Sequence, residues 1–175
     1  MELVPVGDDA TTAAARNLIG EYLTWVAGVA FEHHGLAFDT GAMLASDISD
    51  RSKFYAPHGR FYLLRDVQAF VGVGALQRVD ATTAEIQRMY VQPPWRGRGA
   101  ARLLLDRLLD DARAIGCNVV RLESLKSLAP AHALYRAAGF VEVPPHDLNR
   151  MRRYQDEAAL DAYRDSAVFM ALGLR

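Results

Sequence analysis

The sequence predicts an α/β fold: a twisted, mainly antiparallel sheet of about six to seven strands, with helices on both faces. Short apolar runs rich in β-branched and aromatic residues alternate with longer segments of helical periodicity. Two of these runs, residues 60–66 and 69–79, lie almost next to each other in the chain and predict a hairpin. Three later runs enclose two helical segments, which is the order of a β-α-β-α-β unit.

Length and composition predict one domain spanning residues 1–175 and exclude several functional classes. A chain of 175 residues can bury a sizeable core. The formal net charge of −1 gives no overall field for nucleic acid or an acidic membrane, so neither is expected as a partner. Cys117 is the only cysteine, which excludes an internal disulfide and a cysteine-rich zinc site. No secretory signal or membrane span is recognised, so we expect a cytoplasmic protein.

The first third of the chain is expected to hold one strand and two helices. Residues 2–6 predict a strand, placed at a sheet edge because Pro5 cannot donate to a neighbour. A long helix follows, with Asp8 or Asp9 as its N-cap and its end near His33 and His34. Residues 38–50 predict a second, shorter helical piece.

The middle of the chain carries the clearest pattern. Gly72 and Gly74 interrupt the second hairpin strand and indicate a bulge or a close backbone approach. Residues 83–91 predict a strand that two prolines end. The next helix presents an apolar face and stops at Gly116. A strand, a short helix over 129–139, and strands at 140–143 and 167–174 complete the order.

The stretch "RGRGAA", Arg96 to Ala101, joins that middle strand to its helix. The first N–H groups of a helix lack internal partners and carry partial positive charge, and glycine lets a ligand approach the backbone closely. The loop therefore suits an anion such as a pyrophosphate, although a solvated basic turn is an equal alternative on the loop alone. A Walker A loop lacks its Gly-Lys-Ser/Thr here, and a dinucleotide fingerprint lacks its third glycine.

The surrounding residues resemble the GNAT superfamily of acyl-CoA-dependent N-acyltransferases. Residues 86–116 are similar to motif A, Gln/Arg-x-x-Gly-x-Gly/Ala, which Arg96, Gly99 and Ala101 match. "ALYRAAGF", residues 133–140, resembles the second signature, Leu-Tyr-x-x-x-Gly-Phe, at the expected distance. The resemblance covers about residues 60–143 and 167–172, and the first 55 residues match only in element order. It implies a sheet splayed near its middle.

The resemblance also implies a binding site for acetyl-CoA as co-substrate, with no metal. Backbone groups of the strand before the loop would pair with the acyl carbonyl and the pantetheine amides, and the loop would hold the pyrophosphate. Ser124 would touch cofactor or substrate. The implied cofactor residues are Met89, Tyr90, Val91, Arg96, Gly97, Arg98, Gly99, Ala100, Ala101 and Ser124.

Two residues are candidates for proton transfer. Tyr135 matches the signature tyrosine, whose hydroxyl would donate to the departing thiolate; the alternative is an aromatic residue that only packs. Glu85 opens the strand and is expected to share a face with Gln87 and Met89 by alternation. The resemblance makes Glu85 a candidate base for the amine, against an equal alternative of a solvated residue at a strand edge.

Other positions carry weaker expectations. Adjacent His33 and His34 point apart on a helix, so a helix end is favoured over a metal pair. His132 is expected at the surface. Leu128 stands where many relatives have an asparagine, which weakens one contact with the pantetheine arm.

Residues 144–166 form an atypical insertion for this family, with a helix expected around 156–163. It carries Arg150, Arg152 and Arg153, which would favour an acceptor with a carboxylate or phosphate if the segment borders the acceptor site. Otherwise these arginines are a solvated surface.

The expected activity is direct transfer of an acetyl group from acetyl-CoA to a primary amine on a small molecule or peptide. The rival hypothesis is a non-catalytic acyl-CoA-binding or sensing module on the same fold, which would need the loop but neither Tyr135 nor Glu85. A homodimer is compatible with the sequence. Which amine accepts the acetyl group is left open.

Overall fold

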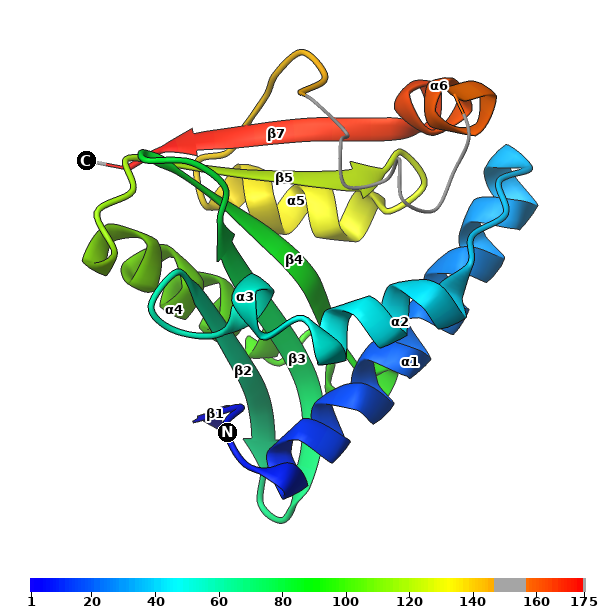
Figure 1. Cartoon of the computed structure of the whole chain (residues 1–175). Coiled ribbons are helices and arrows are strands. Elements are labelled where there is room, and N and C mark those ends of the chain that lie inside the picture. Colours follow the sequence, from blue (N-terminus) through cyan, green and yellow to red (C-terminus); the bar gives the residue numbers. More distant parts are fainter. Residues whose placement is uncertain (147–156, 175) are drawn as a thin grey trace.

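The computed structural model describes residues 1–146 and 157–174, and within them the chain forms one mixed sheet in the order β1-β2-β3-β4-β5-β7-β6 (Figure 1). Neighbouring strands are antiparallel except for β4 and β5, which are parallel. The strands are β1 (Glu2–Pro5), β2 (Gly59–Asp66), β3 (Ala69–Arg78), β4 (Thr83–Val91), β5 (Val119–Leu125), β6 (Val141–Glu142) and β7 (Ala167–Gly173).

Helices cover both faces of the sheet. The helices are α1 (Asp9–His34), α2 (Thr40–Ser49), α3 (Arg51–Phe54), α4 (Ala100–Ala114), α5 (Ala129–Ala137) and α6 (Glu157–Ser166), with a 3-10 turn η1 (Pro93–Trp95). One apolar core joins α4 and α5 to the sheet, and a second joins α1, α2 and α3 to the other face. A third, smaller core lies among α6, the end of α1 and the ends of β5 and β7. The predicted fold class is confirmed.

Local signals explain most element ends. The Asp8 carboxylate accepts a hydrogen bond from the Thr11 backbone, and the Thr11 hydroxyl completes a capping box at the start of α1. Gly35 ends that helix with φ +67, a conformation that glycine adopts without a steric cost. Gly116, with φ +82, follows α4 as expected. Helix α3 was not anticipated, because four residues are too few to show a helical period.

A β-bulge in β4 changes which side chains face which side of the sheet. Ala75 pairs with Gln87 and Val73 with Tyr90, so Arg88 and Met89 both lie opposite Gly74. Arg88 has φ +52, in the left-handed region that non-glycine residues rarely adopt. The alternation along β4 is therefore shifted after Gln87.

The bulge corrects one expectation about β4. Met89 packs in the core under α4, together with Ile86, rather than sharing a face with Glu85 and Gln87. Tyr90 turns to the core under α1. The expectation failed because simple alternation assumes an uninterrupted strand, and the extra residue of the bulge inverts every position that follows it.

The sheet opens between its two parallel strands. Pairing of β4 with β5 is limited to Thr83–Glu85 against Val119–Arg121. Beyond Glu85 the strands diverge, and Figure 1 shows β5 running away from β4 toward α6. The splay predicted by the resemblance is present. It leaves the β5-facing edge of the second half of β4 without a strand neighbour among the described residues.

The late segment is described only in part. Helix α6 spans Glu157–Ser166, close to the helix expected around 156–163. Arg150, Arg152 and Arg153 lie outside the described residues, so their expected role stays a prediction. None of the helices formed by residues 1–146 and 157–174 has the length and apolar character that a membrane crossing requires.

Candidate active site

A cavity of about 700 Å³ passes through the gap between β4 and β5. One end is lined by the glycine loop before α4, and the other by α1, α3 and the polar side chains of β4 and β5. All of the predicted cofactor residues except Arg98 line it, and so do both predicted catalytic residues, Tyr135 and Glu85. Residues that lie far apart in the sequence therefore share a single hollow, which is the candidate active site.

The loop end has the features of an anion site. Gly97 and Gly99 have φ values of +73 and +81, and a Cβ at either would meet no atom within 4 Å. Helix α4 begins directly after Gly99 with no side-chain cap, so its first N–H groups remain available. A phosphate would satisfy those groups and the positive end of the helix dipole.

At the loop end of the cavity, the Arg96 side chain contacts neighbouring residues of the protein. Its Nε donates to the carbonyl oxygen of Val91 at 2.8 Å. Its guanidinium lies 5.0 Å from the Trp25 ring centroid and 5.6 Å from that of Tyr90. The side chain thus ties the loop to β4 and α1. Of the two loop arginines expected at the cofactor, Arg96 lines the cavity and Arg98 does not.

Tyr135, on α5, lines the cavity. The side chain is buried, and its ring lies 5.8 Å from that of Phe140. Burial raises the pKa of its hydroxyl well above the usual value, with a smaller contribution from Tyr22. The hydroxyl therefore stays protonated at neutral pH, which suits a proton donor.

Glu85 is buried rather than solvated, and it is paired. Only 1% of its side chain is exposed, and its Oε2 accepts a hydrogen bond from Arg121 Nε at 3.0 Å. The pair arises because Glu85 and Arg121 are register partners at the last rung of the parallel β4–β5 ladder. An arginine partner holds a carboxylate in place through a charge-assisted hydrogen bond, which suits a positioning role.

Glu123 is the second buried carboxylate of the cavity, and sequence reasoning did not single it out. It lies two residues beyond Arg121, on the same face of β5. Burial raises its pKa to about 7, with smaller opposing contributions from the charges of Arg88 and Arg121. Its Oε2 has no hydrogen-bond partner among the described residues, and the imidazole Nε2 of His146 lies 3.8 Å away. A carboxyl group that titrates near neutrality inside a cavity has the properties of a general base.

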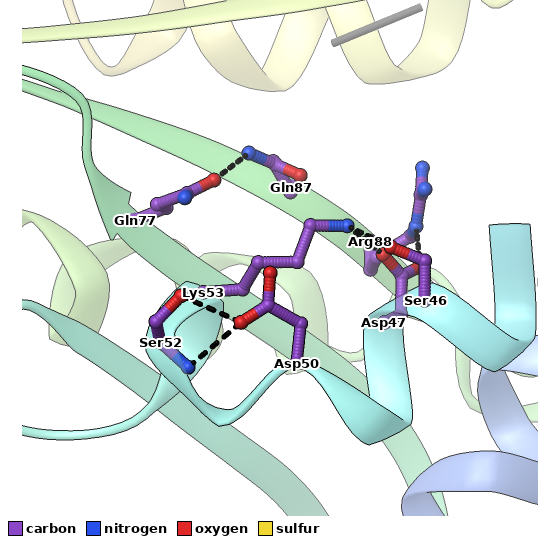
Figure 2. Close-up of polar contacts among 8 residues, drawn as sticks. All are labelled: Ser46, Asp47, Asp50, Ser52, Lys53, Gln77, Gln87 and Arg88. Atoms are coloured by element: carbon purple, nitrogen blue, oxygen red, sulfur yellow. Dashed lines mark hydrogen bonds and ion pairs between the residues drawn. The ribbon is translucent and has the colours of Figure 1, made fainter. Parts of the chain in front are cut away.

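Three charged side chains form a buried cluster beside Glu123, which we call the Asp47 cluster: Asp47, Lys53 and Arg88 (Figure 2). Asp47, on α2, is fully buried. Its Oδ1 accepts a hydrogen bond from Lys53 Nζ at 2.7 Å, and its Oδ2 accepts one from Arg88 Nε. Lys53 Nζ also contacts the Ser46 hydroxyl at 3.3 Å. Lys53 and Arg88 both line the cavity.

The remaining histidine and cysteine expectations fall outside this chemistry. His34 Nε2 lies 3.3 Å from the Ser127 hydroxyl, and the described part of the chain holds no group of three or more potential metal ligands. His132 is buried, with only 4% exposed, rather than lying at the surface as expected, because it occupies the inner face of α5. Cys117 is buried as well, away from the cavity.

Comparisons with known proteins agree with this geometry. Residues 24–140 match the model of the acetyltransferase (GNAT) family. The N-alpha-acetyltransferase RimI of Mycobacterium tuberculosis is 36% identical over 117 residues, which cover 63% of this chain and 69% of that protein.

Two solved structures share the fold. An acetyltransferase from Streptococcus agalactiae superimposes with a TM-score of 0.74 at 16% identity, covering 99% of this chain and 98% of its own. YncA of Salmonella typhimurium, whose structure includes its cofactor acetyl-CoA, gives a TM-score of 0.62 at 19% identity. The match covers 100% of this chain and 95% of YncA.

Proposed function

Because the chain belongs to the GNAT family of acetyltransferases, we propose that it transfers an acetyl group from acetyl-CoA directly to a primary amine. One observation carries the proposal. A single cavity joins an uncapped helix start, which follows two left-handed glycines, to a buried carboxylate with a pKa near 7 and a buried tyrosine. The first feature suits a nucleotide pyrophosphate, and the other two suit proton transfer at a thioester.

Different parts of the cavity would bind different parts of acetyl-CoA. Acetyl-CoA supplies the activated acetyl group. The glycine loop would hold its pyrophosphate through backbone N–H groups, and the splayed edge of β4 at Met89, Tyr90 and Val91 would pair with the pantetheine arm and polarise the acetyl carbonyl. Binding both reactants in one cavity supplies proximity, so no covalent link to the protein is required.

Two side chains handle the protons of the step. The acceptor reacts as the neutral amine, and Glu123 accepts the one proton that its nitrogen loses as the carbon–nitrogen bond forms and the carbon–sulfur bond breaks. Tyr135 donates its hydroxyl proton to the departing thiolate, and after product release Glu123 gives up its proton to solvent and the Tyr135 phenolate regains one from it. We assign proton acceptance to Glu123 in place of Glu85, because Glu85 is already paired with Arg121.

The decisive experiment is a turnover screen with acetyl-CoA against a panel of primary amines, read by release of free thiol. The proposal expects release that depends on both the amine and the protein. Binding of coenzyme A without amine-dependent release from any member of the panel would favour the sensing module instead. Absence of both binding and release would remove the acyl-CoA assignment altogether.

The glycine loop gives a prediction about cofactor affinity. In Gly99→Val, a β-branched side chain occupies the open space above the helix start and disfavours the left-handed backbone. Each lost hydrogen bond from a backbone N–H to phosphate should weaken binding by about 10- to 100-fold. We therefore expect a loss of at least that size in the affinity for coenzyme A, measured by calorimetry.

Gly116→Val is the matched control for that measurement. Gly116 has nearly the same φ, +82, also has open space where a Cβ would stand, and lies at the other end of the same helix outside the cavity. Both variants carry similar backbone strain, so only the loop variant should lose affinity. Equal affinities in the two folded variants would show that phosphate does not bind at Gly99.

A further inference from the structure

The Asp47 cluster contains more positive charge than it can neutralise. Lys53 and Arg88 are two cations, and Asp47 is the one anion bonded to both. The side chains of Lys53 and Arg88 are 11% and 16% exposed, so bulk water does little to screen the excess positive charge. The charge of Glu123 also acts on Arg88, but no hydrogen bond joins the two among the described residues, and Glu123 becomes neutral when it accepts the proton of the amine. The cluster therefore carries about one positive charge that its own members leave without a counter-ion.

Arg88 keeps one edge of its guanidinium for another ligand. Within the described residues, its hydrogen bond to Asp47 uses Nε alone. Figure 2 shows the terminal nitrogens directed away from Asp47. These nitrogens belong to a side chain that lines both the main cavity and a smaller pocket of about 70 Å³. Their planar arrangement matches the two oxygens of a carboxylate.

The position of Arg88 is fixed before any ligand arrives. The bulge turns this residue to the face of Gln87, and Asp47 holds its Nε. Lys53 in turn holds the other oxygen of Asp47. A cation that is already desolvated and oriented loses little conformational entropy on binding, so it discriminates well among ligands.

We propose that Arg88 binds a carboxylate of the acceptor, so that the acceptors of this protein are primary amines that also carry a carboxylate. The inference rests on the proposed acetyl transfer. Glu123 and Arg88 line the same two pockets, so one small molecule can place its amine at Glu123 and its carboxylate at Arg88. The surplus of one positive charge matches a carboxylate better than a phosphate, which carries about −1.5 to −2 at neutral pH.

The smaller pocket narrows the class to amino acids. Arg88 and Glu123 line it together with side chains that form an apolar wall, among them Leu23, Val26 and Met43. An amine and a carboxylate separated by one or two carbons would leave a side chain facing that apolar wall. Amino acids with small or medium apolar side chains fit this description.

The test compares matched acceptors on the unaltered protein. Amino acids such as L-leucine, L-valine and β-alanine are paired with their carboxamides, and kcat/KM is measured by thiol release at pH 7.5. The amides have less basic amines, so a larger fraction of each amide is present as the free, nucleophilic amine at this pH. We nevertheless expect kcat/KM to be about tenfold or more higher for each acid than for its amide, because the acid makes charge-assisted hydrogen bonds to Arg88. Equal or better use of the amides overturns the inference.

The variant Arg88→Met attributes the preference to one residue. We expect kcat/KM for the acid to fall about 10- to 100-fold and that for the amide to change little. Arg88→Lys keeps the charge but loses the planar guanidinium, so its kcat/KM for the acid should lie between that of the unaltered protein and that of Arg88→Met. A similar loss for acid and amide would make Arg88 a positioning residue and overturn the proposal. Arg113→Met, on the exposed face of α4, is the matched control.

Failure of this inference is distinguishable from failure of acetyl transfer. Turnover of other amines, such as polyamines or lysine peptides, without any preference for a carboxylate would overturn the inference and leave acetyl transfer intact. No thiol release with any amine would remove acetyl transfer itself. If Arg88→Met fails to fold, as judged by circular dichroism, the comparison of acids with amides on the unaltered protein still decides.

Discussion

Replacing Tyr135 with phenylalanine is expected to lower kcat by about 100- to 10,000-fold, the usual cost of removing a general acid. The hydroxyl is the only group lost, and the ring keeps its contact with Phe140 at a centroid distance of 5.8 Å. Burial raises the pKa of that hydroxyl, so at neutral pH it is protonated and can donate a hydrogen bond to the thiolate as its charge develops. Affinity for acetyl-CoA, measured by calorimetry, should change little.

Tyr55→Phe is the control for Tyr135→Phe. Tyr55 also has a buried hydroxyl but does not line the cavity. Loss of a buried hydroxyl at Tyr55 should leave kcat near its original value. If Tyr135→Phe also turns over normally, Tyr135 is a packing residue and the proton must reach the thiolate by another route.

Glu123→Gln should produce the second large loss, again about 100- to 10,000-fold in kcat at neutral pH. As a base, Glu123 acts only when ionised. With a pKa near 7, kcat of the unaltered protein should rise with pH through about 7 and then level off. The glutamine variant should lack that rise and recover part of its rate at high pH, where more of the amine is already deprotonated.

Glu85→Gln separates the two carboxylates. This variant breaks the pair with Arg121, so we expect a lower rate with the rise near pH 7 retained. If Glu85→Gln abolishes the rise and Glu123→Gln retains it, the base is Glu85, as the sequence first suggested.

Thermal stability provides an independent check on Glu123. Its folded-state pKa is raised from 4.5 to about 7, so ionising it costs folding free energy as pH rises through that interval. Glutamine carries no such cost. Glu123→Gln should therefore melt at a higher temperature than the unaltered protein at pH 8, and the difference should shrink toward pH 4.

The sequence predicted those features that depend on periodicity and on local conformation. The strand at 83–91, the helix after the glycine loop and its end at Gly116 all follow from spacing and glycine placement. Gly72 and Gly74 indicated an irregularity, and both are explained. A Cβ at Gly72 would lie 3.0 Å from the Tyr90 carbonyl oxygen, and Gly74 lies opposite the bulge.

The features that escaped prediction depend on contacts between distant segments. The bulge is visible only in the pairing of β4 with β3, and it decides that Arg88 and not Met89 faces the polar end of the cavity. Choosing between Glu85 and Glu123 required knowing that Arg121 pairs with the first. Sequence spacing placed both carboxylates on strands, but it did not reveal burial or partners.

The opening between β4 and β5 has a consequence for how this protein could diversify. Its two ends are built by different stretches of chain: residues 96–101 form the loop end, while Tyr22 of α1 and Lys53 of α3 line the other. Under the proposed function, mutations at positions such as Tyr22 and Lys53 could exchange one acceptor for another while leaving the glycine loop unchanged. The acetyl-CoA end of the cavity would then stay the same among related chains while the acceptor end varied. Such chains could share one acetyl transfer reaction and differ in the amine that they acetylate.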